Sequence, residues 1–444
     1  MRTLIKNVAA IMLDAEDRVL QDVSLVLEDK RIVAVGEAPA EFVPDEVIDG
    51  RDMVALPAFF NAHTHAAMTL ERGWAEDLPF ERWLNEKIWV AESALEEEDV
   101  YWGAALAAAE MIRGGIVGFS DHYFWMDQTA RAVEESGMKA LLAWCHFGID
   151  VEQEVGQTSF EETVAFVERW KGGAEGRIHT TMGPHSPYMD PPEVLARFAE
   201  EAHRLGVGVH LHLSESQEQL QSAIQRYGRT PTVHVAELGL LDLPEPTTVA
   251  HCNVVLDDDL ALLAEKGTTV AHTPKTYLKL AMAMPPLLRM LERGVNVAFA
   301  TDGPASNSDL NMLAVMRIAG LYQKGAHGDP EAMPRTSLLR LATQAPAAAM
   351  GFGQSGVLAP GRPADVVLFN TSAPHWIPRH DLAAGVVYTA HPGDVAYVWC
   401  DGRLLYRKGE YLTLDIERIR WEAERRAFRM VGKPMTSMRA YDAG

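Results

Sequence analysis

Cysteine is scarce in this chain of 444 residues, which contains only Cys145, Cys252 and Cys400. Three scattered thiols cannot supply a disulfide framework or a cysteine-based zinc site, so we expect a protein of the reducing cytoplasm. Long hydrophobic runs are lacking too, because no stretch reaches the roughly 20 apolar residues of a membrane span. The amino terminus also lacks the apolar core of a signal peptide, so neither membrane insertion nor secretion is predicted.

Basic residues are the second shortage. Against 62 aspartates and glutamates there are 40 lysines and arginines, which gives a formal net charge of -22. A surface of this sign repels the phosphates of nucleic acids and anionic membranes, so the predicted partner is a small molecule. The chain is longer than the number of residues that usually fold around one hydrophobic core, which favours a large catalytic domain with a smaller companion domain.

Short β-branched runs separated by turn residues mark both ends of the chain. They lie at residues 4–12, 23–27 and 32–35 and again at 364–369, 395–400 and 404–406. Both sets have the pattern of antiparallel strands, and Asp401-Gly402 is a typical hairpin turn between the last two. We therefore predict one small β-sandwich domain built from residues 1–56 and 359–414.

Between these ends, strand-like runs alternate with amphipathic helical stretches. The strands are predicted at residues 54–65, 116–121, 140–145, 178–185, 207–215, 248–252, 269–272 and 295–302. Eight parallel strands with intervening helices describe an α/β fold, the (β/α)8 TIM barrel, over residues 57–358. Residues 415–430 carry apolar side chains at helical spacing, so 415–444 are predicted to form a carboxyl-terminal helix and tail.

Polar residues cluster where the predicted barrel strands end, at the face that carries the active site in such barrels. They are His63, His65, His185, His212, Glu215, His251, His272 and Asp302. Alternation along a strand points His63 and His65 to the same side, so this pair can hold one metal ion from a rigid base. His210 and His212 also share a face, but only one can lie in the metal layer. His212 is nearer the carboxyl end, and His210 is predicted to be a packed interior histidine.

Several motifs, in this order, resemble the amidohydrolase superfamily over nearly the whole chain. Val54-Ala55-Leu56-Pro57 followed by Asn61-Ala62-His63-Thr64-His65 is similar to its first strand, and Ala300-Thr301-Asp302-Gly303 is similar to its eighth. The closer resemblance is to the S-adenosylhomocysteine and 5′-methylthioadenosine deaminases, a group of chlorohydrolase-like aminohydrolases. It rests on residues 68–78, on residues 183–188, and on Glu215 three positions after His212.

The resemblance implies a metal centre held by four residues, His63, His65, His212 and Asp302. Relatives with two metals usually bridge them with a lysine on the fourth strand, and residues 177–184 contain none. One ion per chain is therefore expected. Three imidazoles and a carboxylate suit zinc, with iron as the alternative.

By the same resemblance, the reaction is the hydrolytic deamination of an adenine-like heterocycle, such as adenosine or 5′-methylthioadenosine, with release of ammonia. Hydroxide generated on the metal would attack the amino-bearing carbon. Asp302 would accept a proton and His251 would orient the nucleophile. Glu215, protonated in the resting complex, would protonate the neighbouring ring nitrogen.

Four further residues are predicted to contact the substrate. Glu92 aligns with the glutamate that holds the ribose hydroxyls in the family, and His185 with the histidine beside the sugar. The family's arginine for the carboxylate of S-adenosylhomocysteine falls at Trp144, so this end of the pocket is predicted to favour a neutral or aromatic group. Lys275, in an unusual loop at residues 273–284, is a candidate contact to an anionic substituent from another side.

Two other functions stay open. One is aminohydrolase or chlorohydrolase activity on guanine, pterin or s-triazine rings. The other is a metal-free barrel with a structural or interaction role, although polar groups that converge at one mouth argue against it. By resemblance we also expect a homo-oligomer.

Overall fold

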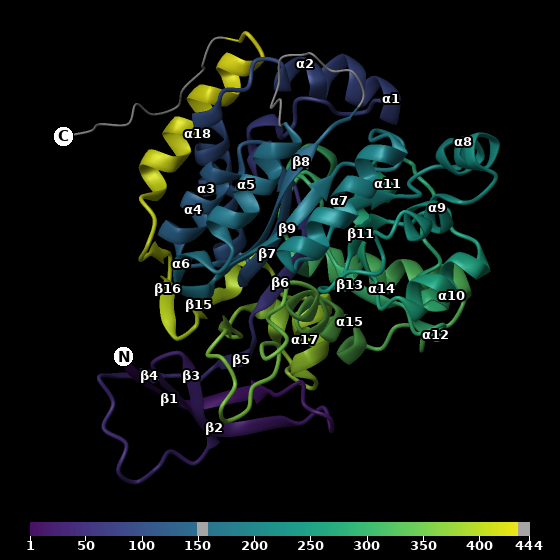
Figure 1. Cartoon of the computed structure of the whole chain (residues 1–444). Helices are drawn as coiled ribbons and strands as arrows, with labels where there is room; N and C mark the ends of the chain where they lie inside the picture. Colours follow the sequence, from purple (N-terminus) through teal and green to yellow (C-terminus); the bar gives the residue numbers. More distant parts are fainter. Residues whose placement is uncertain (149–158, 434–444) are drawn as a thin grey trace.

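The computed structural model describes residues 1–148 and 159–433. The predicted tail from 434 to 444 lies outside the described residues. Three sheets are found in this part of the chain, one mixed and two parallel (Figure 1). Strands β1 to β4 of the mixed sheet lie at one end of the molecule, and helices α1 (Phe80–Trp83) and α2 (Trp89–Glu92) lie at the other.

The mixed sheet combines strands from both ends of the chain in the order β17-β16-β15-β14-β5-β1-β2-β3, with β4 paired to β1. Its strands are β1 (Arg2–Ile11), β2 (Val19–Glu28), β3 (Arg31–Gly36), β4 (Glu46–Asp49), β5 (Met53–Pro57), β14 (Val366–Asn370), β15 (Val395–Cys400), β16 (Arg403–Arg407) and β17 (Glu410–Tyr411). The two ends meet where β5 pairs antiparallel with β14, with Val54 opposite Phe369. Ile5, Leu25 and Trp399 lie in the buried core of this sheet.

Two four-stranded parallel sheets follow, β6-β7-β8-β9 and β10-β11-β12-β13. Their strands are β6 (Phe59–Thr64), β7 (Ile116–Tyr123), β8 (Lys139–His146), β9 (Ile178–Pro184), β10 (His210–Leu213), β11 (Thr248–His251), β12 (Thr269–His272) and β13 (Asn296–Phe299). Backbone hydrogen bonds link the two sheets at both seams, where β9 meets β10 and where β13 meets β6. The Met182 N–H donates to the Gly208 carbonyl at 3.1 Å, and the Asp302 N–H donates to the His63 carbonyl at 3.0 Å.

The predicted strand over 54–65 is two strands, and this expectation is corrected. Pro57 ends β5, which belongs to the mixed sheet, and β6 begins at Phe59 in a parallel sheet. Proline has no N–H to continue a ladder, so the chain changes sheets there.

Helices connect the parallel strands, and further helices follow β13. The longer ones are α3 (Glu97–Arg113), α4 (Met126–Ser136), α5 (Phe160–Trp170), α7 (Pro192–Leu205), α8 (Gln217–Tyr227), α9 (Pro231–Glu237), α10 (Asp257–Glu265), α14 (Met312–His327), α15 (Arg335–Ala342) and α17 (Leu382–Tyr388). The shorter ones are η1 (Ala66–Glu71), η2 (Leu84–Ile88), α6 (Gly173–Gly176), α11 (Pro274–Lys279), α12 (Leu287–Glu292), α13 (Pro304–Asn307) and α16 (Gln344–Ala349). Over the described ranges, none of the helices is long and apolar enough to cross a membrane.

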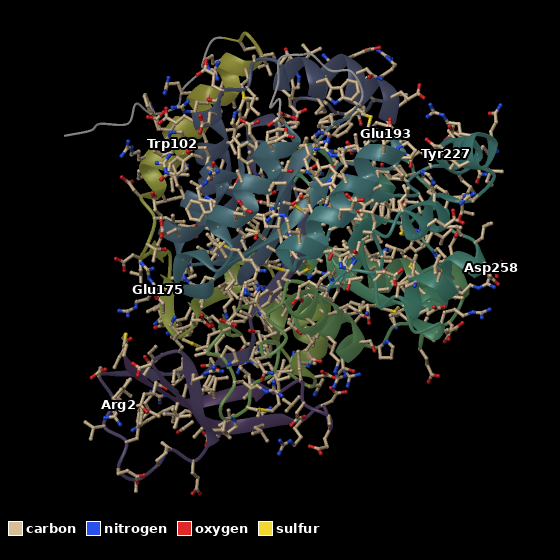
Figure 2. All side chains as sticks on the ribbon, in the orientation of Figure 1. Arg2, Trp102, Glu175, Glu193, Tyr227 and Asp258 are labelled. Atoms are coloured by element: carbon tan, nitrogen blue, oxygen red, sulfur yellow. The ribbon has the colours of Figure 1, made fainter. Side chains whose placement is uncertain are left out.

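Helix α18 (Ile416–Met430) lies along α3 at the side of the molecule (Figure 1). Arg426 is buried there, with Nη1 2.8 Å from Oδ1 of Asp99. The guanidinium of Arg418 lies 5.0 Å from the ring of Trp102, which Figure 2 shows at this boundary. Removing one partner of a buried ion pair is costly, so these contacts fix α18 against α3.

A buried lysine ties the mixed sheet to the first parallel sheet. Lys139 begins β8, and its Nζ lies 2.6 Å from Oδ2 of Asp365 and 2.7 Å from Oδ1 of Asp401. The mixed sheet is therefore fixed at the amino end of β8. The carboxyl ends of the parallel strands are left free to carry a site.

Candidate active site

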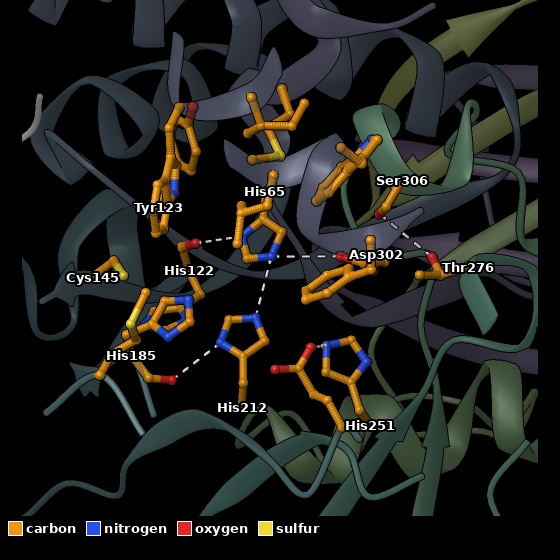
Figure 3. Close-up of a pocket in the computed structure, with 18 of the residues that line it drawn as sticks. His65, His122, Tyr123, Cys145, His185, His212, His251, Thr276, Asp302 and Ser306 are labelled. Atoms are coloured by element: carbon orange, nitrogen blue, oxygen red, sulfur yellow. Dashed lines mark hydrogen bonds and ion pairs between the residues drawn. The ribbon is translucent and has the colours of Figure 1, made fainter. Parts of the chain in front are cut away.

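Three imidazoles and a carboxylate meet at the carboxyl ends of β6, β10 and β13. Figure 3 shows His65, His212 and Asp302 of this group. The ligand atoms of His63, His65 and His212 all lie within 4.8 Å of one another. Nε2 of His65 is 3.4 Å from Nε2 of His212. Oδ1 of Asp302 is 3.7 Å from Nε2 of His63 and 3.5 Å from Nε2 of His65.

This donor set fits a single transition-metal ion. Metal–nitrogen bonds of about 2.0–2.1 Å in a tetrahedral centre place neighbouring ligand atoms roughly 3.3 Å apart, close to the distances above. Nε2 of His63 is buried and has no hydrogen-bond partner among the described residues. Buried polar atoms are normally paired, so a nitrogen left without a partner beside two other imidazoles is in the state expected of a metal ligand.

Hydrogen bonds on the far side of two rings turn them toward this centre. Nδ1 of His65 lies 2.6 Å from the carbonyl oxygen of His122, and Nδ1 of His212 lies 3.1 Å from that of His185. A carbonyl only accepts, so each Nδ1 carries the proton and each Nε2 presents its lone pair. Burial is also the main cause that lowers the pKa of His212 to about 4, which keeps this ring neutral and able to bind a metal.

The backbone is strained where the site residues leave their strands. His251 and Asp302 have φ values of 82° and 65°, in the left-handed region that side chains larger than glycine rarely adopt. Such conformations cost about 1–3 kcal/mol each and are found where they aim a functional group. The turn after Asp302 also needs Gly303, because a Cβ there would lie 2.9 Å from Sδ of Met68 and 3.1 Å from Cβ of His65.

Glu215 lies two residues beyond the end of β10, beside the metal cluster, the name used here for the side chains of His63, His65, His212 and Asp302. The Tyr188 hydroxyl and Nε2 of Gln219 (3.3 Å) donate to its Oε2, while its Oε1 is 3.4 Å from Nε2 of His251. Burial raises the pKa of Glu215, but the imidazoles of His251 and His212 and the two hydrogen bonds outweigh it, and the net pKa lies below the usual value. A proton on Glu215 in the complex with substrate stays a prediction.

A largely apolar pocket leads to the cluster. The segment of α1, η2 and α2 contributes Phe80, Trp83, Leu84, Ile88, Trp89 and Glu92. Phe124, Phe147, Tyr188, Met189, Leu280 and Met282 line other parts of it. Within the described ranges, no lysine or arginine lines the pocket.

Glu92 and His185, both predicted to contact the substrate, line this pocket. Glu92 is buried and accepts a hydrogen bond of 2.6 Å from the Tyr123 hydroxyl, and burial raises the pKa of Glu92 to about 7. The His185 ring stacks on His212 and on Phe147, with both ring centroids at 4.5 Å. An aromatic wall therefore extends from His212 into the pocket.

Trp144, also predicted to contact the substrate, does not line the pocket, and this expectation is corrected. Its ring packs on Phe166 of α5 at 5.7 Å, on the outer side of β8. Side chains alternate along a strand, so Cys145 and Phe147 share the inner side and line the pocket instead.

Lys275 is not among the pocket residues either, which corrects the fourth substrate expectation. Its Nζ lies 2.8 Å from Oδ1 of Asp309. The unusual loop at 273–284 still contributes to the site, because it contains α11 and supplies Thr276, Leu280 and Met282 to the lining.

Tyr188, Tyr123 and Phe147 are site residues that the sequence analysis did not single out. Tyr188 ends the segment 183–188 that carried part of the family resemblance, so its position was visible but its contact with Glu215 was not. His210 is as expected an interior histidine, with no exposed surface and with partners on both ring nitrogens.

Comparisons with known proteins agree with this geometry. Residues 54–405 match the Amidohydrolase family. A curated 5-methylthioadenosine/S-adenosylhomocysteine deaminase from Dictyoglomus thermophilum is 41% identical over 433 residues, which cover 98% of this chain and 100% of the relative. The crystal structure of an adenosine deaminase from Xanthomonas campestris with bound zinc is 31% identical, covers 97% of this chain and 98% of its own, and has a TM-score of 0.91. The crystal structure of an atrazine chlorohydrolase from Arthrobacter aurescens covers 96% of this chain and 100% of its own, with a TM-score of 0.87. Its sequence identity is 24%, so this match shows similarity of fold alone.

Proposed function

The chain belongs to the amidohydrolase family and is a hydrolase of C–N bonds, and we propose that it is a zinc-dependent deaminase of adenine-like nucleosides such as adenosine or 5′-methylthioadenosine. One observation carries the proposal. A centre of three imidazoles and a carboxylate lies beside a buried glutamate, at the base of an aromatic pocket. The nearly full-length similarity to proteins named as deaminases supports this reaction over others of the family.

In this proposal His63, His65, His212 and Asp302 hold one zinc ion. When bound, zinc acts as a Lewis acid that lowers the pKa of water from about 15.7 to about 7 and so provides a nucleophile at neutral pH. The lysine-free strand β9 and the single cluster of metal-ligating residues found in the described ranges support one ion rather than two.

Asp302, His251 and Glu215 handle the protons of the reaction. Burial raises the pKa of Asp302, but His251, His65 and the Gly303 N–H outweigh it, so Asp302 is ionised and can accept a proton from the attacking water. His251 orients that water. Glu215 delivers a proton to the ring nitrogen next to the carbon under attack. Glu215 takes this proton from water and regains one from the hydroxyl added to the ring, so each turnover consumes one water and releases one ammonia.

Glu92 and His185 are proposed to bind the sugar. A carboxylate with two acceptor oxygens suits a pair of ribose hydroxyls, and Glu92 lines the same pocket as His185. The Tyr123 hydroxyl occupies one position on this carboxylate and fixes its orientation.

The 5′ substituent is proposed to be neutral. The His185 ring stacks on His212 with one face and on Phe147 with the other, so Phe147 lies one ring beyond His185 along the pocket wall. Phe124 packs on Phe147 at 5.6 Å and continues this apolar surface. A charged amino-acid tail would find no basic side chain among the described pocket residues, and residues 149–158 also contain none.

We further propose that the two parallel sheets form one closed (β/α)8 barrel over residues 57–358. The seam hydrogen bonds at Gly208 and Asp302 support closure. The mixed sheet would form the companion domain from residues 1–56 and 359–414, with 415–444 as a terminal helix and tail. A homo-oligomer is proposed by family resemblance.

A product screen tests the proposed reaction. The purified protein, with zinc supplied, is incubated separately with adenosine, 5′-methylthioadenosine, S-adenosylhomocysteine, guanine, a pterin and an s-triazine. Mass spectrometry should show loss of NH and gain of O in the adenine nucleosides, with equimolar ammonia. Turnover of only guanine, the pterin or the triazine would refute the substrate assignment. Full activity after removal of all bound metal would refute the metal centre.

A further inference from the structure

The three histidines of the metal cluster are not held in the same way. His65 and His212 donate from Nδ1 to backbone carbonyls, which cannot be changed by a side-chain substitution. Nδ1 of His63 instead lies 2.8 Å from Nε2 of His210, the next inward-facing residue before His212 on β10. His63 is thus the one ring of the three whose far nitrogen meets a side chain.

Two imidazole nitrogens at this distance need one donor and one acceptor. If His210 donated, His63 would accept at Nδ1 and carry its own proton on Nε2, where it would point at the metal. If His63 donates, its Nε2 is bare, and His210 must carry its proton on the opposite nitrogen. That nitrogen, Nδ1 of His210, lies 3.0 Å from Oγ of Ser120, which can accept it.

We propose that His210 is a positioning residue of the metal centre, which accepts the proton of His63 through Nε2 and is itself fixed by Ser120. The inference rests on the proposed metal centre, and it assigns a role to a histidine that the catalytic scheme does not use. A ring partner of a ligating histidine normally fixes both its tautomer and its orientation.

Within the described residues, the hydrogen bond recorded at Nδ1 of His63 is the one to His210. His63, His210 and Ser120 are all fully buried, with 0% exposure. The His122 ring stacks on His210 at 5.2 Å with an interplanar angle of 17°, so the plane of His210 is fixed as well. Without His210, the buried Nδ1–H of His63 would have no acceptor, and the metal-binding tautomer would lose its support.

Zinc affinity, measured without substrate, tests the proposal. In His210→Leu the acceptor is lost, and in His210→Gln an amide oxygen reaches the same position. We expect His210→Leu to bind zinc about 10- to 100-fold more weakly in competition with a chelator, with most of the affinity restored in His210→Gln. Ser120→Ala should give a smaller loss. Cobalt-substituted samples should show a changed visible absorption spectrum in the leucine variant alone.

His179→Leu is the matched control. His179 lies toward the amino end of β9, where it bonds the Met350 carbonyl at 2.8 Å and stacks on Phe352, so its loss should lower stability without changing zinc affinity. Urea unfolding of the metal-free variants separates stability from affinity. If His210→Leu binds zinc as tightly as the wild type, or His210→Gln binds as weakly as His210→Leu, the role of His210 is wrong. A wild type that binds zinc but deaminates nothing would refute the proposed function and leave the result for His210 standing.

Discussion

Replacing Phe147 by arginine should move substrate preference toward S-adenosylhomocysteine. Phe147 lines the pocket and stacks on His185, so a guanidinium at this position would face the substituent carried by the sugar. A bidentate contact between this group and the amino-acid carboxylate is the interaction that the wild-type pocket lacks. Trp144→Arg, the change that the sequence alone suggests, would place the charge against Phe166 outside the pocket.

The size of the effect follows from the position. A charge-assisted hydrogen bond contributes about 1.5–3 kcal/mol, and about 1.4 kcal/mol corresponds to a factor of ten. Residue 147 is half-buried, so water weakens the contact and the lower part of this range applies. We expect the ratio of kcat/KM for S-adenosylhomocysteine to that for 5′-methylthioadenosine to rise by roughly tenfold.

Steady-state kinetics on both nucleosides measure this ratio. Phe147→Leu removes the aromatic ring without adding charge, and Trp144→Phe removes the indole N–H outside the pocket, so neither should raise the ratio. The gain in Phe147→Arg should also decrease with salt, because it depends on an ion pair near water. If wild-type protein already prefers S-adenosylhomocysteine, another group binds its carboxylate and the reasoning about this wall is refuted.

The remaining predictions concern the metal, the protons and the assembly. Glu215→Gln and Asp302→Asn should lower kcat by roughly 10² or more with little change in melting temperature, since each residue is assigned to proton transfer; near-normal turnover in the glutamine variant would remove Glu215 as the acid. Metal analysis should find one zinc per chain and a large loss in His212→Ala, whereas two equivalents would contradict the single-ion centre. The raised pKa of Glu92, about 7, means that this carboxyl is ionised and a good acceptor only above that pH, so KM for adenosine should rise as pH falls through 7; the same pH dependence in Glu92→Gln would exclude it as the source. Solution scattering should give a mass above that of one chain, and a monomer would contradict the expected homo-oligomer.

The pair His63 and His65 was predictable because the period of a strand is short and exact, whereas His212 and Asp302 were assigned as ligands by resemblance. Side chains two residues apart on a strand point to the same face, so His63 and His65 could be placed on one face from the sequence. The same rule, applied to β8, places Trp144 on the opposite side from Cys145. The resemblance located the family's arginine along that strand but did not establish which face the corresponding residue occupies here, and the expectation for Trp144 failed on that point.

Other features depend on contacts between distant parts of the chain. The pKa of Glu215 is lowered by two histidines on different strands and by Tyr188, 27 residues away. The ion pair between Lys275 and Asp309 likewise forms across 34 positions. Periodicity reports the local environment of a segment, so such pairings are visible only once the strands are in place.

The pairing of β5 with β14 also has a consequence for biosynthesis. Val54 leaves the ribosome long before Phe369, its partner in the ladder, has been synthesised. At about 5–20 residues per second, the edge of β5 waits roughly 15–60 s for the strand that covers it. An unpaired edge of a sheet is a template for the wrong partner, including a second nascent chain. We therefore expect that a chaperone, or slow collapse of the nascent chain, keeps the edge of β5 from wrong pairing until the last quarter of the polypeptide emerges.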